Sequence, residues 1–395
     1  MTIKDIADIQ TGPFGSQLHK EDYVDDGTPI VTVEHLGKRI FTEQNLPGVS
    51  DEDKERLSRY ILNEGDIVFS RVGSVDRCSY VDTNHEGWMF SGRCLRVRPK
   101  TIVYPLYLYY YFCSEEVKQY IRNIAVGATM PSINTKLLGE VPIELPDYKI
   151  QKVIADALSS IDSKIELNEE INENLLQQAI ALFGEALNRS VNLSYTELGA
   201  LADVKGGKRL PKGVNLITTR NTHPYIRVRD LNNVVFASLS ADYEYVDDET
   251  QKSIARYIVS AGDVLISIVG TIGLTAIVDK SLDQANLTEN CVKISNLKGI
   301  SPEYLLLYLR SPDGIEKIKK GTVGAVQLKL PIKNIQAIQT PLLSKEELDS
   351  LDNVLKSIFE QISLNVTESK SLAEVRDALL PRLMSGEMDV SCLDF

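Results

Sequence analysis

The 395-residue sequence has few of the residues that build metal and disulfide sites. It contains five cysteines, four histidines and one tryptophan, and its cysteines lie far apart with no C-x-x-C pair. Zinc sites and disulfide frameworks are normally built from closely spaced sets of cysteine and histidine. We therefore expect no metal site and no disulfide, and a reducing, cytoplasmic environment.

Long apolar runs are also lacking. A membrane-spanning helix needs roughly 18 consecutive apolar residues, and no stretch of the sequence approaches that length. The first ten residues carry acidic side chains, whereas a secretory signal peptide has a basic start and an apolar middle. The sequence predicts a soluble protein without a membrane partner.

Catalytic motifs are missing as well. There is no G-x-x-x-x-G-K-[ST] loop, no Gly-rich cofactor loop after a strand, and no Asn-Pro-Pro-Tyr-like or Asp-Pro-Pro-Tyr-like motif for amino methylation. Pro312-Asp313 with Glu316 and Lys319 is a faint match to a nuclease carboxylate set, but the spacing is wrong and chance explains it better. We predict no catalytic residue and a non-catalytic chain.

What the sequence does contain is an internal repeat. Ile6-Ala-Asp-Ile-Gln-Thr-Gly12 returns 195 positions later as Leu201-Ala-Asp-Val-Lys-Gly-Gly207. Arg59-Tyr-Ile-Leu-Asn-Glu-Gly-Asp66 returns 197 positions later as Arg256-Tyr-Ile-Val-Ser-Ala-Gly-Asp263. Repetition at a fixed offset indicates one structural unit used twice.

Each unit ends in a segment with helical periodicity. Apolar residues recur there at steps of three and four, which is typical of a coiled-coil seam. Gly184 and Pro381 are the first residues to interrupt the two segments, so each helix should run for about 33 residues, or roughly 50 Å. The predicted seam residues are Ile154, Leu158, Ile161, Ile165, Asn168, Asn172 and Leu175, and Leu351, Leu355, Ile358, Ile362, Asn365, Ser369 and Leu372.

The two helices should pair in opposite directions. A compact domain usually has its ends close together, so the second domain returns the chain to the end of the first helix and the second helix runs back along it. Near the centre, Asn168 would then pair with Ser369 and Asn172 with Asn365. Such polar layers fix register and direction at some cost in stability. A solvated gap in an imperfect seam is the alternative.

The expected fold class is α+β. It comprises two tandem mixed α/β domains separated by a pair of long antiparallel helices, with an internal pseudo-twofold repeat. Strands are expected at 30–33, 66–70, 94–98, 225–228, 263–267 and 291–294, and helices at 105–124 and 302–320. The predicted segments are 1–146, 147–190, 191–343 and 344–395.

The negative charge is concentrated in the helical segments. The net charge is -12, and residues 147–189 and 344–395 carry ten of these charges between them. The rest of the chain is therefore close to neutral and can present a basic face, because local patches govern contact with phosphates.

Several motifs resemble those of one protein family. They are Thr11-Gly-Pro-Phe-Gly-Ser-Gln-Leu18, Glu64-Gly-Asp-Ile-Val-Phe-Ser-Arg-Val-Gly-Ser74, Gly127-Ala-Thr-Met-Pro-Ser-Ile-Asn134 and the ending Leu372-Ala-Glu-Val-Arg-Asp-Ala-Leu-Leu-Pro-Arg-Leu-Met-Ser-Gly-Glu387. Together they resemble the specificity subunits of type I restriction-modification systems. The second domain departs from the pattern, with Lys208-Arg-Leu-Pro in place of Pro-Phe-Gly-Ser and Ile268 in place of Arg71.

The resemblance implies a DNA reader. Each recognition domain would read one half of a bipartite, asymmetric target on double-stranded DNA, while the helix pair holds the spacer and docks DNA methyltransferase subunits, two of them, joined by restriction/translocase subunits. S-adenosylmethionine, ATP and Mg would be bound by those partners only, and this chain would hold no cofactor. The competing interpretation is a coiled-coil interaction scaffold with no role on DNA.

The predicted DNA contacts are polar and basic loop residues. Arg, Asn and Gln can bind base edges through paired hydrogen bonds, whereas Lys mainly neutralises phosphate. Arg227 and Arg229 alternate with apolar residues and are expected to share one strand face. The full set is Ser16, Gln17, Lys20, Lys38, Arg39, Arg71, Ser74, Arg77, Thr129, Ser132, Asn134, Lys136, Lys205, Lys208, Arg209, Lys212, Arg220, Arg227, Arg229, Gln327, Lys329 and Lys333.

Overall fold

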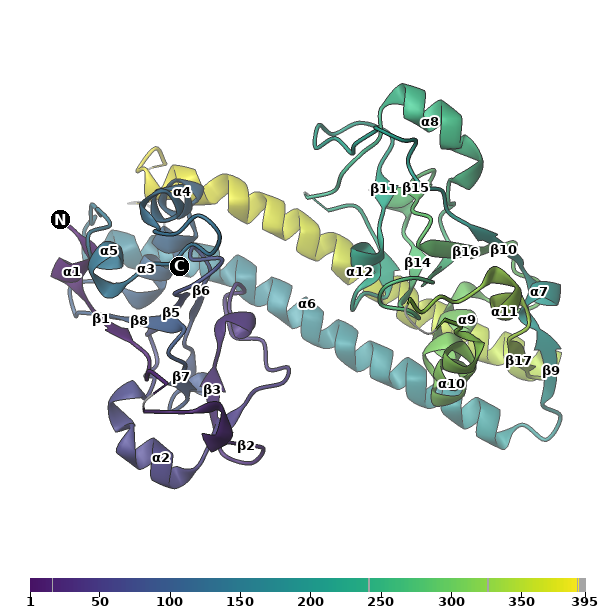
Figure 1. Cartoon of the computed structure of the whole chain (residues 1–395), viewed down its shortest axis with the longest axis horizontal. Helices are drawn as coiled ribbons and strands as arrows, with labels where there is room; N and C mark the ends of the chain where they lie inside the picture. Colours follow the sequence, from purple (N-terminus) through teal and green to yellow (C-terminus); the bar gives the residue numbers. More distant parts are fainter. Residues whose placement is uncertain (16, 241, 325–326, 389, 391–395) are drawn as a thin grey trace. The chain divides into compact units, whose positions relative to one another are not determined.

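A computed structural model describes residues 1–15, 17–240, 242–324, 327–388 and 390. The chain forms two compact units: unit 1 is Met1–Glu166 with Ser371–Phe395, and unit 2 is Leu167–Lys370. Each unit contains one copy of the repeat's mixed domain and a part of both long helices (Figure 1). The helix pair is therefore shared by the two units.

Unit 1 is built on a four-stranded antiparallel sheet with the strand order β1-β8-β5-β6. A second small sheet has the order β2-β4-β3-β7. The elements are α1 (Ile3–Ile6), β1 (Ala7–Thr11), β2 (Tyr23–Val24), β3 (Thr28–Val31), β4 (Gly48–Val49), α2 (Asp51–Arg56), β5 (Ile67–Ser70), β6 (Cys78–Tyr80), β7 (Met89–Phe90), β8 (Cys94–Pro99), α3 (Pro105–Cys113), α4 (Glu115–Ile124), α5 (Thr135–Gly139) and the start of α6 (Tyr148–Arg189).

The main sheet of unit 1 separates two hydrophobic cores. Successive residues of a strand face opposite sides, so Ile67 and Phe69 pack with α3 and the start of α6, while Val68 packs with the small sheet. We call the α3 side the helical lobe and the small-sheet side the strand lobe. Leu158 of α6 belongs to the core of the helical lobe, which attaches this lobe directly to the helix pair.

Unit 2 repeats this plan, with a five-stranded sheet in the order β10-β16-β13-β14-β12. Val264 and Ile266 of β13 face α9, whereas Leu265 faces the opposite core. The elements are β9 (Ser194–Glu197), α7 (Leu198–Leu201), β10 (Asp203–Gly206), β11 (Tyr225–Ile226), β12 (Phe236–Ala237), α8 (Asp248–Ile254), β13 (Val264–Ser267), β14 (Thr275–Val278), β15 (Asn286–Leu287), β16 (Cys291–Ser295), α9 (Pro302–Arg310), α10 (Pro312–Gly321), α11 (Ile332–Gln336), β17 (Gln339–Leu342) and α12 (Lys345–Met384).

The helices predicted at 105–124 and 302–320 are each split in two. The breaks fall at Ser114 and Ser311, whose backbones are extended. Ser311 precedes Pro312, and the residue before a proline disfavours helical backbone angles. The Ser311 hydroxyl then accepts a 3.1 Å hydrogen bond from the Gly314 N–H and caps the second helix.

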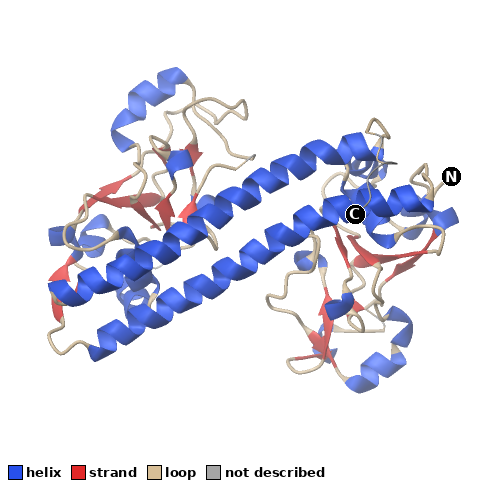
Figure 2. Cartoon of the chain, turned by 180° about the vertical axis from the view of Figure 1, so that it is seen from behind, coloured by secondary structure: helices blue, strands red, loops and turns tan. Residues whose placement is uncertain are grey.

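The long helices exceed their predicted length. Helix α6 has 42 residues and α12 has 40, and they continue past Gly184 and Pro381. Figure 2 shows each of them as one uninterrupted helix. The cost of about 1 kcal/mol for a helical glycine is small against burial of Phe183 next to it. Pro381 falls in the last turn of α12, so it removes one backbone hydrogen bond and only three helical residues follow it.

The two helices are antiparallel within each unit. In unit 2, Asn168 donates to the Ser369 hydroxyl at 3.2 Å, and Asn365 donates to the Asn172 carbonyl at 2.8 Å, so rising numbers on α6 meet falling numbers on α12. These are the two pairings expected from the sequence. Asn168 also donates to Glu368 at 2.7 Å, which satisfies its buried amide further. All predicted seam residues are buried or half-buried.

Within the described ranges, no helix combines the length and the apolar character needed to cross a membrane.

Candidate nucleic-acid interface

Three loops of unit 1, carrying Phe14, Arg71 and Met130, meet at the end of the main sheet. We call this surface the first loop face. The Ile133 N–H donates to the Arg71 carbonyl at 2.9 Å and the Gly73 N–H donates to the Pro131 carbonyl at 2.9 Å, which joins two of the loops. The Arg71 guanidinium lies 5.2 Å from the centre of the Phe14 ring, which joins the third.

A close backbone approach holds the Phe14 loop in place. Gly12 donates its N–H to the Cys94 carbonyl at 3.2 Å. A Cβ atom on Gly12 would lie 2.2 Å from the Ser91 carbonyl oxygen, so only glycine fits without displacing the backbone. Sterics therefore explain why the motif at 11–18 has glycine at position 12.

The Met130 loop is closed by a pair of backbone hydrogen bonds. Val126 and Ser132 exchange N–H to carbonyl bonds of 2.9 and 2.8 Å, and the Ser132 hydroxyl donates to the Val126 carbonyl. Gly127 has a φ of 112°, a conformation that favours glycine. The loop presents Met130 with 66% of its surface exposed.

Arg71 is the cation at the centre of the first loop face. It is half-buried, and it donates to the Gly92 carbonyl at 3.2 Å while lying over Phe14, which is 53% exposed. A guanidinium held on an aromatic ring is oriented before any ligand arrives. Its remaining N–H groups are suited to base edges or phosphate oxygens.

Unit 2 builds an equivalent second loop face around Lys208, Ile268 and Lys329. Gly207 takes the place of Gly12 and donates to the Cys291 carbonyl at 2.9 Å. Lys329 and Val323 exchange backbone hydrogen bonds as Ser132 and Val126 do. Ile268, in the position of Arg71, is only 4% exposed and belongs to the core. The two faces share a scaffold and differ in chemistry.

Two cations of the second loop face, Lys208 and Arg209, come from the loop after β10, and Lys329 lies on the loop between α10 and α11. The Lys208 ammonium lies 5.5 Å from the centre of the Tyr257 ring. Arg209 is exposed and donates to the Glu289 carboxylate at 2.6 Å. The positive charge thus stands on a different loop from Arg71 in unit 1, as the sequence difference at Lys208-Arg-Leu-Pro suggested.

Some predicted contacts are used inside their own domain. The Asn134 side chain accepts a hydrogen bond from the N–H three residues on and caps α5. Gln17 accepts the Tyr60 hydroxyl at 2.7 Å. Arg39 does not face the loops and instead binds Glu166 of α6. These side chains have structural partners in unit 1.

The prediction for Arg227 and Arg229 was wrong. They do not share a strand face, because β11 ends at Ile226 and a 3-10 helix covers Val228–Leu231. Both arginines form ion pairs with Glu244. The Asp230 carboxylate accepts the Arg227 N–H at 2.7 Å, which starts the 3-10 turn. A local cap overrides the alternating pattern.

Burial strongly raises the pKa of one carboxylic acid in this cluster. It raises the pKa of Asp230 to about 6, against the opposing effect of Arg229. The Tyr243 ring, the Asp242 and Glu244 carboxylates and Arg229 surround it. Asp230 therefore titrates close to neutral pH.

The remaining predicted contacts lie on the surface. Ser16 and the side chain of Lys20 lie outside the described part of the chain. Lys205 lies at a separate recess of unit 2 and binds Asp203 at 3.1 Å. The exposed residues are Lys38, Ser74, Arg77, Thr129, Lys136, Lys205, Lys208, Arg209, Lys212, Arg220, Gln327, Lys329 and Lys333.

Three residues of the first loop face were not among the predicted contacts. Phe14 and Met130 lie within the quoted motifs, and their exposure marks them. Arg93 is exposed, and its carbonyl accepts the Arg71 N–H at 2.8 Å. Its place just before the predicted strand at Cys94 was the available signal.

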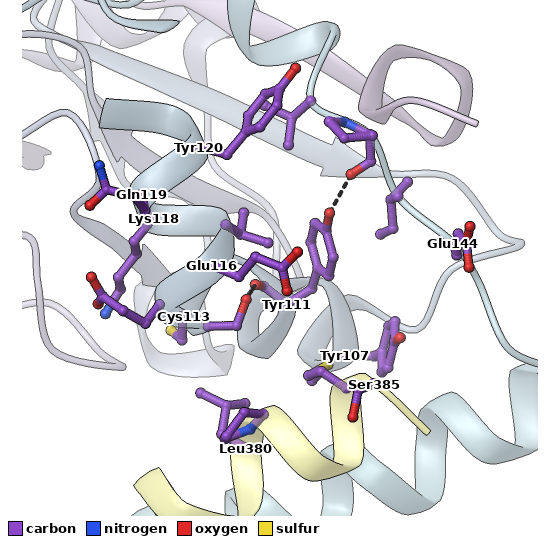
Figure 3. Close-up of a pocket in the computed structure, with 18 of the residues that line it drawn as sticks. Tyr107, Tyr111, Cys113, Glu116, Lys118, Gln119, Tyr120, Glu144, Leu380 and Ser385 are labelled. Carbon is purple, nitrogen blue, oxygen red and sulfur yellow. Dashed lines mark hydrogen bonds between the residues drawn. The ribbon is translucent and has the colours of Figure 1, made fainter. Parts of the chain in front are cut away.

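Unit 1 also has a large recess that contains none of the predicted contacts (Figure 3). Its volume is about 1000 Å³, and it lies between α4, residues 141–144 and the end of α12. Tyr111 crosses it and donates its hydroxyl to the Pro142 carbonyl, and Leu380 of α12 forms part of its wall. The recess borders the helix pair and is distinct from the loop face.

Comparison with known proteins gives a consistent result. The family model described as type I restriction modification DNA specificity domain matches residues 1–177 and again 191–373. The specificity subunit of the type I restriction enzyme HindI from Haemophilus influenzae is 24% identical, over 91% of this chain and 92% of that protein. The MjaIX specificity subunit from Methanocaldococcus jannaschii is 22% identical, over 98% and 93%.

A solved structure supports the same fold. The crystal structure of a type I restriction-modification S subunit from M. genitalium is 18% identical to this chain. It aligns over 99% of this chain and 96% of that chain with a TM-score of 0.56. The two family matches also coincide with the two copies of the internal repeat.

Proposed function

Because the chain belongs to the type I restriction-modification DNA specificity family, whose members recognise the DNA target, we propose that its two units each read one half of a bipartite, asymmetric target. This family membership disfavours a coiled-coil scaffold with no role on DNA. The chain contributes recognition and carries out no catalysis itself.

The duplicated loop face is the observation that carries this proposal. The same three loops recur in both units, but Arg71 and Phe14 in the first face are replaced by Ile268 and Arg209 in the second. Identical faces would favour a symmetric target, since base edges are read by side-chain chemistry. Different side chains on a shared scaffold fit two different half-sites.

The helix pair is proposed as the spacer and as the docking surface for the methyltransferase subunits. Its segments carry ten of the chain's twelve net negative charges, which disfavours contact with DNA phosphates. Two methyltransferase subunits would bind, one for each unit, and restriction subunits would join that complex. S-adenosylmethionine, ATP and Mg would be held by these partners.

A domain exchange tests the proposal. Residues 1–145 are replaced by the corresponding domain of another family member, and the targets of the complex with its methyltransferase are mapped by methylome sequencing. We expect one half-site to change and the other half-site and the spacer to stay the same.

Exchange of residues 191–343 is the matched control and should change the other half-site. A change in both half-sites after either exchange would contradict independent reading. Absence of any methylated bipartite site with the native chain would contradict the proposed function as a whole.

A further inference from the structure

Arg39 joins the strand lobe of unit 1 to helix α6. Its Nε donates to one Glu166 carboxylate oxygen at 2.8 Å, and its terminal nitrogen donates to the other oxygen and to the Ser163 hydroxyl at 3.1 Å. The Arg39 and Glu166 side chains are only 16% and 27% exposed. A bidentate, shielded ion pair is both stronger and more directional than a surface pair.

The short loop that carries Arg39 is itself held rigidly. The Gly37 N–H donates to the Ser79 hydroxyl at 3.1 Å, and that hydroxyl donates to the Lys38 carbonyl at 2.7 Å. The Tyr80 N–H donates to the Arg39 carbonyl at 2.7 Å. Strand β6 therefore fixes the backbone from which Arg39 extends. The ion pair consequently holds the whole strand lobe, and not only a mobile loop, in a fixed position on α6.

Arg39 also stays positively charged in its ion pair with Glu166. Burial by itself would lower its pKa, but the hydrogen bond and charge of Glu166 raise it above the usual value for arginine. The side chain that was predicted to bind DNA is thus committed to a carboxylate on the helix.

We propose that the Arg39–Glu166 pair is a positioning contact that fixes the angle of the first recognition domain on the spacer helix, and thereby the spacer length that the protein accepts. This inference rests on the proposed bipartite recognition. The helical lobe is already attached to α6 through Leu158. The ion pair adds a second attachment from the strand lobe, and two attachments prevent the domain from pivoting about one.

Unit 2 also has a polar contact between its domain and a long helix. The loop after β12 meets α12, where the Lys370 ammonium donates to the Ser238 hydroxyl at 2.6 Å and to the Leu239 carbonyl at 2.7 Å. The Phe236 ring lies edge-on to Phe359, with 6.2 Å between their centres. A loop of each domain is therefore bonded to a long helix, through an arginine–carboxylate pair in unit 1 and through a lysine with a hydroxyl and a carbonyl in unit 2.

The angle matters because DNA is helical. Adding one base pair to the spacer moves a half-site by about 3.4 Å and rotates it by about 35° around the duplex. A braced domain cannot follow this rotation without breaking the ion pair, whereas a domain that pivots can follow part of it. Loss of the pair should therefore relax the choice of spacer more than it weakens binding to the half-site itself.

The test measures methylation by the complex of the full chain with its methyltransferase. The DNA substrates carry the two half-sites, identified by methylome sequencing, at the native spacing and with one base pair added or removed. For Arg39→Ala and for Glu166→Gln we expect the preference for native spacing to fall by at least about fivefold. Because both variants break the same contact, the double variant should be no worse than either single one.

Two further variants separate positioning from DNA contact. Arg56→Ala removes an exposed arginine that pairs with Asp53 within α2, so it changes the charge equally and should leave the preference intact. The charge exchange Arg39→Glu with Glu166→Arg should recover part of the preference.

The inference would be overturned if Glu166→Gln kept the native preference while Arg39→Ala weakened binding to all sequences equally. That pattern, with a salt dependence reduced by about one phosphate contact, would make Arg39 a DNA contact. Unchanged spacing preference in both variants would also overturn it. A native complex that methylates no bipartite site would instead refute the proposed function, so the two failures can be told apart.

Discussion

Arg71 and Ile268 occupy equivalent positions in the two repeats but have opposite environments. Arg71 is half-exposed and lies over the Phe14 ring, whereas Ile268 is buried in the core of unit 2. Duplication has therefore kept the backbone of the loop while its side chain changed from a surface cation to a core residue. Under the proposed function, recognition by the second unit must use other side chains, and its loop face carries the cations Lys208, Arg209 and Lys329.

Replacing Arg71 should weaken one half-site selectively. Arg71→Ala removes a guanidinium that is already oriented by Phe14, and we expect a loss of about 1–3 kcal/mol in binding for the half-site read by unit 1. Binding assays at fixed salt, with single base changes in each half-site, measure the effect.

Lys54→Ala, on exposed helix α2 of the same unit, is a matched removal of one positive charge. If target affinity is the same for Arg71→Ala and for the native protein, Arg71 does not contact DNA.

Asp230 should make the stability of unit 2 depend on pH. Its folded pKa of about 6 lies above the ordinary value of 3.8, so its contribution to stability is fully present below pH 3.8 and is lost as the pH rises through about 6. Asp230→Asn removes this titration while its side-chain carbonyl can still accept the Arg227 N–H.

Urea unfolding at several pH values should therefore show the native protein losing stability relative to Asp230→Asn, by on the order of 2 kcal/mol between pH 4 and pH 7.5. A constant difference between the two proteins over this range would mean that burial does not shift Asp230.

The polar layers are the informative feature at the level of the helices. Asn168 and Asn365 are buried where a coiled-coil seam would normally carry leucine. Each amide finds a partner on the facing helix, so neither leaves a buried polar group unpaired. These layers fix the register of α6 against α12 at the expense of apolar contacts.

Replacing one pair of asparagines by leucines should show how much stability the polar layer costs. Asn172→Leu with Asn365→Leu is expected to stabilise the protein by about 1 kcal/mol, because an apolar pair replaces two desolvated amides. Either single change should destabilise it by about 1 kcal/mol, since it leaves the other amide unpaired. Thermal unfolding followed by circular dichroism measures all three, and a double variant less stable than both singles would contradict the role of the layer.

Sequence periodicity predicted the strands of the buried core correctly. It failed where a local cap or break ended an element earlier than the apolar pattern indicated. The strands at β5 and β13 were predicted because their residues are almost all apolar, and those at β8 and β16 because apolar residues alternate there with polar or basic ones. The 225–228 strand was shortened by the Asp230 cap, which acts through a backbone N–H that periodicity does not register. The Ser114 break in the 105–124 helix was likewise missed, because the apolar pattern continues across it.

At the scale of the whole molecule, the length of the helix pair should set the spacing of the two half-sites. A heptad inserted after Glu166 in α6 and another after Lys370 in α12 fall at matching layers of the antiparallel pair. Seven residues add about 10.5 Å of helix, which corresponds to about three base pairs. Because each added base pair also rotates a half-site by about 35°, methylation mapping should show a longer spacer whose length is set by the added rise and the rotation together.

Insertion into only one helix is the control. It shifts the Asn168 and Asn172 layers out of register and should destabilise the protein instead of changing its spacer. An unaltered spacer in the variant with both insertions would show that the helix pair does not determine it.

The sequence by itself determined the duplication, the two long helices, their antiparallel pairing and the polar layers between them. These features depend on residue spacing along the chain, and spacing can be read from sequence because helices and repeats have fixed periods. The tertiary structure alone decided how loops far apart in sequence meet, and hence that Arg71 lies on Phe14 while Arg39 binds Glu166. Arg71 follows strand β5 and Arg39 lies in the loop after Gly37, and the local sequence does not show which ring or carboxylate each will meet. Their roles are set by which carboxylates and rings the folded chain brings within reach, and that depends on the packing of whole lobes.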